Sequence, residues 1–267
     1  MLYLVRMSEP KDTLSSALIT KDLKTRFVGQ RVIYHPTLTS TMDISRTEAK
    51  RGAVEGTIVI TDEQIAGRGR LQRVWLSPRG SIALSVILRP TLACLPYLTM
   101  LASLAVARSI EAVTALKPRL KWPNDVLINE KKVCGILIES NVRADKVDYA
   151  IIGIGINVNL RLEDYPEILP IATSLYHELK KEVSRLNLLR HLLVEIENLY
   201  LAISAGQSIF EEWRDSLVTL GKKVRVKSGD AVQEGIAESV TRDGSLLLRR
   251  PDGTLNKILA GDVTLQD

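Results

Sequence analysis

Residues 64–75, QIAGRGRLQRVW, set the strongest limit on what this chain can fold into. They combine three arginines, two glycines and one tryptophan in an order too irregular for a core element. Glycine permits a positive φ and a close approach of the backbone to a ligand, and the planar arginine fork matches two phosphate oxygens. The indole of Trp75 offers a face on which a base can stack. The segment predicts a phosphate-binding loop, with a solvated basic turn as the alternative.

Two predicted strands, residues 57–61 and 81–88, flank this loop, because both are rich in β-branched residues. The long helix predicted over residues 96–116 is expected to pack beneath a sheet. The remaining periodicities predict a short helix over 14–23, a strand over 31–35, a helix from Ser40-Thr41 to Lys50 closed by Gly52, a hairpin of strands 126–128 and 133–139 turning at 129–131, a buried strand over 148–158, and helices over 184–205 and 208–218.

The pattern changes from Gly221 onward to short alternating strands, with turn sequences at residues 228–230, 242–244 and 251–253. This predicts a small β-barrel or sandwich. Residues 222–267 contain eight Lys or Arg and seven Asp or Glu. A nucleic-acid-binding domain normally has a strong excess of basic residues, so this region is not expected to be one.

Composition indicates a soluble globular protein with one large and one small domain, since the 267 residues are 45% hydrophobic and 25% charged. The net charge of +5 is dispersed, which favours anions such as nucleotide phosphates over nucleic acid. Cys94 and Cys134 lack metal-ligand spacing, which predicts reduced core thiols. Residues 1–9 carry no signal-peptide pattern, Met7 is an alternative start, and no apolar run approaches about 18 residues. We therefore expect a cytoplasmic protein without a membrane partner.

Three further runs accompany the arginine loop: residues 121–125 (KWPND), 131–139 (KKVCGILIE) and 153–159 (GIGINVN). In this order, the four segments together resemble the catalytic core of the biotin protein ligases. The resemblance covers roughly residues 27–265. Lipoate ligases share the fold, but the Gly-Arg-Gly-Arg loop and the KWPND run are marks of the biotin branch.

The resemblance implies an α+β fold in which a biotin/lipoate ligase-like catalytic domain, residues 27–219, has a mixed β-sheet flanked by helices. A short N-terminal extension, residues 1–26, precedes it, and a small C-terminal β-barrel domain, residues 220–267, follows. The extension is too short for a complete winged helix-turn-helix domain. We therefore expect the form of the ligase that lacks the N-terminal DNA-binding domain and has no nucleic-acid partner.

The implied reaction activates biotin with ATP as biotinyl-5'-AMP, releases pyrophosphate, and transfers biotin to a specific lysine of a biotin carboxyl carrier protein or domain of a carboxylase. ATP and biotin are substrates, Mg²⁺ is expected with ATP, and a homodimer is possible. The alternatives are a lipoate or octanoate ligase on the same fold, and a biotin-responsive transcriptional repressor, which the short extension disfavours. A third treats the C-terminal domain as a binding module on a degraded enzyme, against which Arg68, Arg70 and Lys132 argue.

Both steps build negative charge, so the site needs fixed cations. The resemblance assigns the catalytic roles to Lys132, Arg68, Arg70 and Asp125. It assigns ATP binding to Arg68, Arg70, Arg73, Trp75, Asn124, Asp125 and Lys132. It assigns biotin binding to Ser40, Thr41, Met42, Gln64, Gly67, Arg68, Gly69, Arg70, Lys132, Gly135, Gly155 and Asn157. No protein-held metal site is expected.

Some of these assignments have structural alternatives. Lys131 beside Lys132 leaves open a merely cationic turn, and Asn124-Asp125 binds ribose or Mg²⁺ unless it is simply a turn after proline. Gly135 and Gly155 are expected to leave room for the ligand. Met42 and Gln72 depart from the commoner family pattern, and Gly153-x-Gly155 lacks the third glycine of a dinucleotide loop. Before ligands bind, the loop arginines are expected to repel one another.

Overall fold

The computed structural model describes residues 12–229 and 231–266. The expectations about a signal peptide and about Met7 as a start therefore lie outside the described residues. Between residue 12 and the first strand, the described chain forms a single five-residue helix, α1 (Ser16–Thr20). Those residues alone do not build the two or three helices that a winged helix-turn-helix needs.

Seven strands form one mixed sheet, in the order β1-β2-β3-β7-β6-β5-β4. Strands β1 and β2 are parallel, and every other neighbouring pair is antiparallel. This confirms the predicted α+β class. The strands are β1 (Val32–Leu38), β2 (Ile58–Gln64), β3 (Ile82–Leu88), β4 (Arg119–Lys121), β5 (Asp125–Ile128), β6 (Lys131–Arg143) and β7 (Lys146–Ile156).

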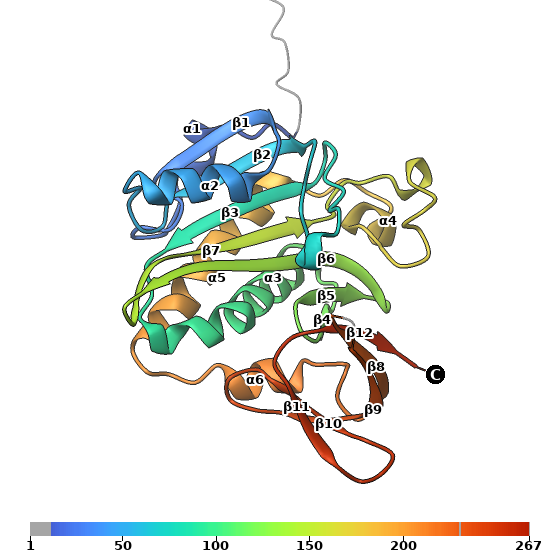
Figure 1. The fold of residues 1–267 in the computed structure, drawn as a ribbon. Helices are drawn as coiled ribbons and strands as arrows, with labels where there is room; N and C mark the ends of the chain where they lie inside the picture. Colours follow the sequence, from blue (N-terminus) through green and yellow to red (C-terminus); the bar gives the residue numbers. More distant parts are fainter. Residues whose placement is uncertain (1–11, 230, 267) are drawn as a thin grey trace, which may run out of the picture.

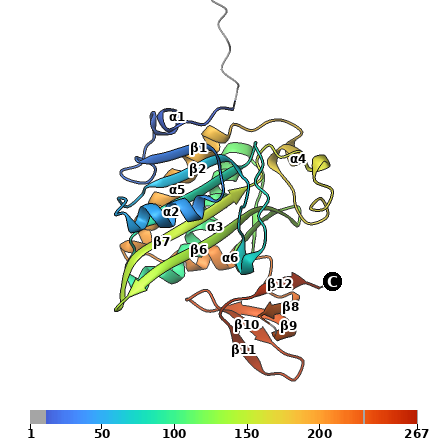
Figure 2. The same ribbon diagram turned by 45° about the horizontal axis from the view of Figure 1, so that its top comes forward.

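Helices cover the two faces of this sheet unequally (Figures 1 and 2). Helices α3 (Leu98–Thr114) and α5 (Arg185–Ser204) lie on one face and close the main apolar core. Helix α2 (Thr41–Lys50) lies on the other face and contacts β2, β3 and β7. A second, smaller cluster beneath α2 contains Met42, Ile87 and Ile151. The part of this face beyond α2 is where the predicted site residues gather.

The long helix corrects one expectation from the sequence. Residues Leu92–Thr114, which combine the 3₁₀ turn η2 (Leu92–Tyr97) with α3, are apolar and long enough to cross a membrane by length and composition. In this structure 61% of that apolar window is buried inside the protein. Ten residues of α3 are buried, and they pack under the sheet as predicted, so its apolarity serves the core.

The segment after β7 holds the short elements η3 (Leu162–Asp164) and α4 (Leu175–Leu179) before α5, and α6 (Phe210–Asp215) follows α5. The predicted helices over 184–205 and 208–218 are thus present, the second shorter than expected. Ser184 caps α5, because its hydroxyl accepts a hydrogen bond from the Asn187 amide.

Five antiparallel strands form the C-terminal sheet, in the order β11-β10-β9-β8-β12. Their pairing is linear, so β11 and β12 are the edges of the sheet among the described residues, and the small C-terminal β-domain expected from Gly221 onward is present. The sheet adjoins β4, and the indole Nε1 of Trp122 donates to the Gly244 carbonyl at 2.8 Å. The strands are β8 (Lys223–Ser228), β9 (Ala231–Val240), β10 (Leu246–Arg249), β11 (Leu255–Ile258) and β12 (Asp262–Leu265).

Candidate active site

A row of small residues crosses the open face of the large sheet. Ala83, Gly155, Gly135 and Asp125 are successive register partners on β3, β7, β6 and β5. The residues that flank the two glycines in sequence are buried in the main core on the opposite face, as strand alternation requires. The row is therefore a floor without side-chain bulk until Asp125.

The indole of Trp75 covers this floor. A Cβ atom at Gly155 would overlap the indole ring around Nε1, and one at Gly135 would lie 3.0 Å from its Cζ3 atom. The expected space above the glycines is thus occupied by a side chain of the same protein. Trp75 Nε1 is buried and has no hydrogen-bond partner among the described residues.

Lys132 lies at the edge of the floor. Its Nζ atom is 2.6 Å from Asp125 Oδ1 and 5.3 Å from the centroid of the Trp75 ring. A register shift in the β5–β6 pairing changes the alternation just before Gly135, which lets Lys132 reach the same face. The backbone of Lys132 is fixed by Ile171 and Thr173 at 3.0 and 2.8 Å. By contrast, Lys131 Nζ donates to the Leu169 carbonyl at 3.0 Å, so the two lysines point to different partners.

The arginine loop is folded back on itself. The Gly69 amide donates to the Arg73 carbonyl at 2.7 Å, and the Trp75 amide donates to the Gly67 carbonyl at 2.9 Å. Neither glycine has a positive φ; Leu71, with φ of 52°, takes the left-handed conformation instead. Gly67 is required for a different reason, because a Cβ atom there would overlap the Trp75 carbonyl oxygen. The two glycines thus do not use the positive φ that glycine permits, and the close approach of Gly67 is made to the loop's own backbone.

Each arginine of the loop has an oxygen partner, so the expected repulsion is compensated. Arg68 pairs with Asp43 of α2, and Arg73 pairs with Asp262 of β12. Arg70 donates to Asn124 Oδ1 at 3.0 Å and to the Gly261 carbonyl at 3.4 Å. Burial lowers the pKa of Arg70, but a guanidinium keeps its charge at neutral pH. The loop is thus held between α2 and the C-terminal sheet.

Ser40, Thr41 and Gln64 meet at the start of α2. The Thr41 amide donates to Gln64 Oε1 at 2.9 Å, and the Ser85 hydroxyl donates to Thr41 Oγ1 at 2.7 Å. Ser40 occupies the N-cap position, but its hydroxyl makes no capping hydrogen bond. That hydroxyl is buried without a partner among the described residues, which leaves it available to a polar ligand group.

The biotin/lipoate A/B protein ligase family matches residues 34–157, and the biotin protein ligase C-terminal domain matches residues 219–265. The chain is 38% identical to the bifunctional ligase/repressor BirA of Bacillus subtilis, over 97% of this chain and 82% of that protein. It is 30% identical to the biotin–acetyl-CoA-carboxylase ligase of Mycobacterium tuberculosis, over 95% and 97% of the two chains. The chain belongs to the biotin protein ligase family.

A solved structure agrees with this assignment. The biotin protein ligase from Aquifex aeolicus in complex with biotin and ATP matches with a TM-score of 0.76 at 30% sequence identity. The match covers 89% of this chain and 99% of that one. The shared fold therefore includes both the large sheet and the C-terminal sheet.

Asn157, unlike most of the other predicted biotin-binding residues, has its side chain directed to the segment that follows β7. It is buried at the end of β7, and its side-chain amide donates to the Thr173 carbonyl at 3.0 Å. Its main-chain amide donates to the Val133 carbonyl at 2.9 Å. Asn157 thus ties the segment after β7 to the sheet near Lys132. Met42, on α2, packs over Gly153, with its Sδ atom 2.6 Å from the position of a Cβ atom on that glycine.

Sequence reasoning missed Asp43, Ser85, Lys121, Gly261 and Asp262. Lys121 is the register partner of Asp125, and burial lowers its pKa, opposed chiefly by the charge of Asp125. A signal for Lys121 was present, since it begins the KWPND run. Asp43 lies in the first turn of α2, just after the predicted Ser40–Met42 group. Gly261 and Asp262 carried no local signal.

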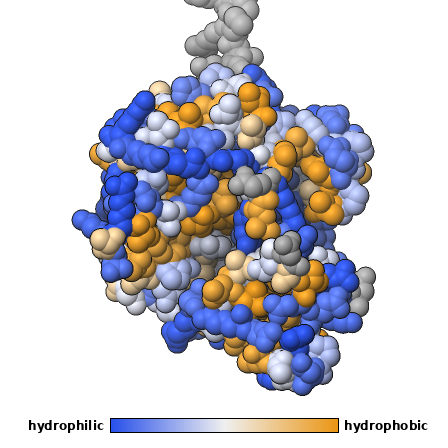
Figure 3. Space-filling model, viewed as in Figure 1, coloured by the Kyte–Doolittle hydropathy of each residue, from blue (hydrophilic) through white to orange (hydrophobic). Residues whose placement is uncertain are grey.

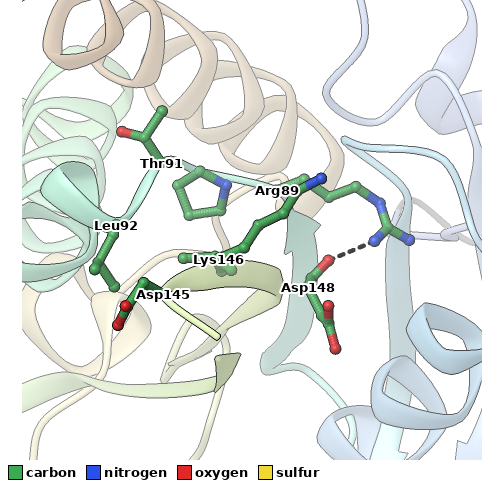
Figure 4. Close-up of a pocket in the computed structure, with 8 residues that line it drawn as sticks. Arg89, Thr91, Leu92, Asp145, Lys146 and Asp148 are labelled. Carbon is green, nitrogen blue, oxygen red and sulfur yellow. Dashed lines mark hydrogen bonds between the residues drawn. The ribbon is translucent and has the colours of Figure 1, made fainter. Parts of the chain in front are cut away.

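Apolar surface is visible over β6 and β7 below the polar side chains of α2 (Figure 3). A separate pocket lies at the opposite end of β3 and β7, between residues 89–92 and 145–148 (Figure 4). There Arg89 Nη1 donates to the Asp148 carbonyl at 2.5 Å. Strand β3 begins and β7 ends at the glycine floor, so the pocket lies at the other end of both strands. None of the residues that line it is a predicted ligase site residue.

Proposed function

We propose that this protein is an ATP-dependent biotin ligase that makes biotinyl-5'-AMP and then biotinylates a lysine of a carrier protein. In the first step a carboxylate oxygen of biotin attacks the α-phosphorus of ATP, and pyrophosphate leaves. In the second step the carrier amine attacks the acyl carbon, AMP leaves, and the amine loses a proton. The relatives named above as biotin ligases support this assignment.

The observation that carries the proposal is the position of Lys132 beside Asp125 and Trp75, with Arg68, Arg70 and Arg73 in the loop above. Bringing a carboxylate to a triphosphate costs several kcal/mol unless fixed cations oppose the repulsion. Here the arginines and Lys132 are already oriented by oxygen partners of the protein. Substrate oxygens can take the place of those partners without a large rearrangement of the cations.

Lys132 is best placed to act on the reacting atoms. Its ammonium is a compact charge at the floor, and three of its contacts, with Asp125, Trp75 and Gly135, are within the site. We assign it the developing charge on the carboxylate and the α-phosphate. Arg68, at the α2 side, suits the biotin carboxylate, and Arg70 and Arg73, at the C-terminal side, suit the phosphates.

Mg²⁺ is proposed to enter with ATP as part of the substrate. The described residues contain no group of three His, Cys, Asp or Glu side chains that could hold a metal ion. Asp125 is the one predicted site carboxylate, and Asn124 lies next to it. Mg²⁺ characteristically binds through one or two carboxylates and substrate phosphates, so these two residues fit a metal that phosphates bring. We expect activity to follow the concentration of the Mg²⁺–ATP complex.

We propose a cytoplasmic location and a carboxyl carrier domain as the protein partner. The location is supported by Cys94 and Cys134, which are buried and unpaired, as in reducing compartments. Burial also raises the pKa of the Cys134 thiol, which keeps it unreactive. We also propose a homodimer, which is supported by the position of β1 at an edge of the large sheet. Light scattering at several concentrations tests the dimer.

Pyrophosphate release with ATP and Mg²⁺ in the presence of biotin, lipoate or octanoate tests the proposed substrate. We expect release that depends on biotin. Release only with lipoate or octanoate would retain the adenylating fold and replace the substrate. No pyrophosphate release with any of the three carboxylates would overturn the assignment of an active ligase.

A further inference from the structure

We propose that Gly135 and Gly155 are positioning residues that act through Trp75: they form a seat that fixes the indole beside Lys132. The sequence suggested that these glycines contact the ligand itself. The proposal rests on the ligase activity proposed above, since it concerns the same site, but the seat can be tested without that activity.

The seat is formed by two strands in register. Gly135 and Gly155 are Cα partners on β6 and β7 and share the open face. A Cβ atom at Gly155 would overlap three atoms of the indole, including Nε1. One at Gly135 would lie 3.0 Å from Cζ3 of the ring and 3.1 Å from Cε of Lys132. Real Cβ atoms essentially never approach within 3.0 Å, so an alanine at position 155 must displace the ring.

A third glycine fixes the backbone that carries the indole. Gly67 accepts a hydrogen bond from the Trp75 amide at 2.9 Å, and a Cβ atom at Gly67 would overlap the Trp75 carbonyl oxygen. The main chain of Trp75 is therefore held against residue 67 of the same loop. Pressure on the ring from position 155 must be relieved by rotation of the side chain or by opening of the loop.

The fit of the ring, and not a hydrogen bond, holds it in place. Trp75 Nε1 has no hydrogen-bond partner among the described residues. The Lys132 ammonium lies 5.3 Å from the ring centroid, within the range of a cation–π interaction. Because no hydrogen bond from the described residues fixes the ring, the shape of the glycine seat decides where this wall of the site lies relative to Lys132.

Gly153 provides a matched control on the same strand and face. A Cβ atom there would lie 2.6 Å from Sδ of Met42, with no atom of Trp75 among its three nearest neighbours. Gly153→Ala therefore presses on a neighbouring side chain in the same region without touching the indole. Its effect on catalysis should be the same whether or not Trp75 is present.

A double-mutant cycle on kcat/KM for biotin-dependent pyrophosphate release tests the coupling. Gly155→Ala is expected to lower kcat/KM about tenfold or more in the wild-type background, the order found for residues in contact. In the Trp75→Ala background its further cost should be less than about threefold, within the additivity limit for independent sites. A cost of Gly155→Ala that is equal in both backgrounds would mean that the glycine serves the ligand directly, and would overturn the proposal.

Tryptophan fluorescence tests the seat even if the protein has no ligase activity. The chain has three tryptophans, of which Trp122 and Trp213 are buried in the core. Gly155→Ala should shift the emission of the folded protein, and the shift should vanish in the Trp75→Phe background. Gly153→Ala should leave the Trp75 emission in place. An unchanged spectrum for Gly155→Ala, with an unchanged fold by circular dichroism, would contradict the seat regardless of activity.

Discussion

On the face that α3 and α5 cover, strands β6 and β7 place Ile136, Ile152 and Ile154 in one buried cluster. On the opposite face the same strands place three glycines, with Lys132 at the edge. The first face is filled by branched side chains of its own strands. The second carries Ile151 and Tyr149 of β7 beneath α2, but beside the glycines it is filled by Trp75 and Met42, which come from a loop and a helix. Alternate positions of the two strands thus separate stability from chemistry, so substitutions on the two faces should have different consequences.

The largest effect is expected from Lys132→Ala on the open face. It removes the ammonium from the floor, and pyrophosphate release should fall by about 10² to 10³-fold or more, as for loss of a preorganised charge partner. The free energy of unfolding should change little, because Lys132 is partly exposed. Lys131→Ala is the control, since Lys131 contacts the Leu169 carbonyl. Equal losses of pyrophosphate release in the two variants would show that Lys132 has no catalytic role that Lys131 lacks.

Ile152→Ala examines the covered face. Ile152 is fully buried in the main core, so its truncation should lower the free energy of unfolding by about 2–5 kcal/mol. The KM for biotin of the folded enzyme should stay within about twofold of the wild-type value, because the substituted side chain does not contact the biotin site. Urea unfolding followed by kinetics well below the melting temperature checks both. A large rise in KM with little loss of stability would contradict the separation of the two faces.

Asp262→Asn probes the border between the open face and the C-terminal sheet. The change weakens the ion pair between Asp262 and Arg73, of which Arg73 is largely exposed. Exposed pairs contribute roughly 0.2–1 kcal/mol, so we expect the KM for ATP to change by less than about fivefold. Asp252→Asn, on a remote turn of the same domain, should not change it. An equal change in the KM for ATP in both variants would show that the contact of Asp262 with the arginine loop does not contribute to ATP binding.

The smallest effect concerns Tyr34, away from the site. Burial and a hydrogen bond to Asp62 raise the pKa of its phenol to about 12. The unfolded chain loses this proton near pH 10, so the associated stability is complete below pH 10 and is lost as the pH rises through about 12. Tyr34→Phe should lack this alkaline decline. Parallel unfolding curves for both proteins from pH 9 to 11 would contradict it.

The sequence predicted most elements of the large sheet and its helices, because hydrophobic periodicity is a local signal. The hairpin at residues 129–131 and the strand over 148–158 are present with shifts of a few residues. The order of the strands in the C-terminal sheet was not predictable in this way. Whether β11 and β12 meet depends on the curvature of the whole sheet, and turn sequences fix only neighbouring strands.

For the site, the sequence identified the arginine loop and Lys132 but not their partners. Arg73 meets Asp262 across a separation of 189 residues, and Trp75 meets Gly155 only because the loop folds back over β7. Neither contact leaves a local pattern. The conformation of the loop was missed because the left-handed residue is Leu71, while glycine is the residue that pattern reasoning expects there.

The decisive experiment on the ligase activity is mass spectrometry of a biotin carboxyl carrier domain incubated with the protein, biotin, ATP and Mg²⁺. We expect one biotinyl group on a single lysine of the carrier, formed by the wild-type protein and not, in the same time, by Lys132→Ala. An unmodified carrier with the wild-type protein, or equal labelling by both proteins, would contradict it.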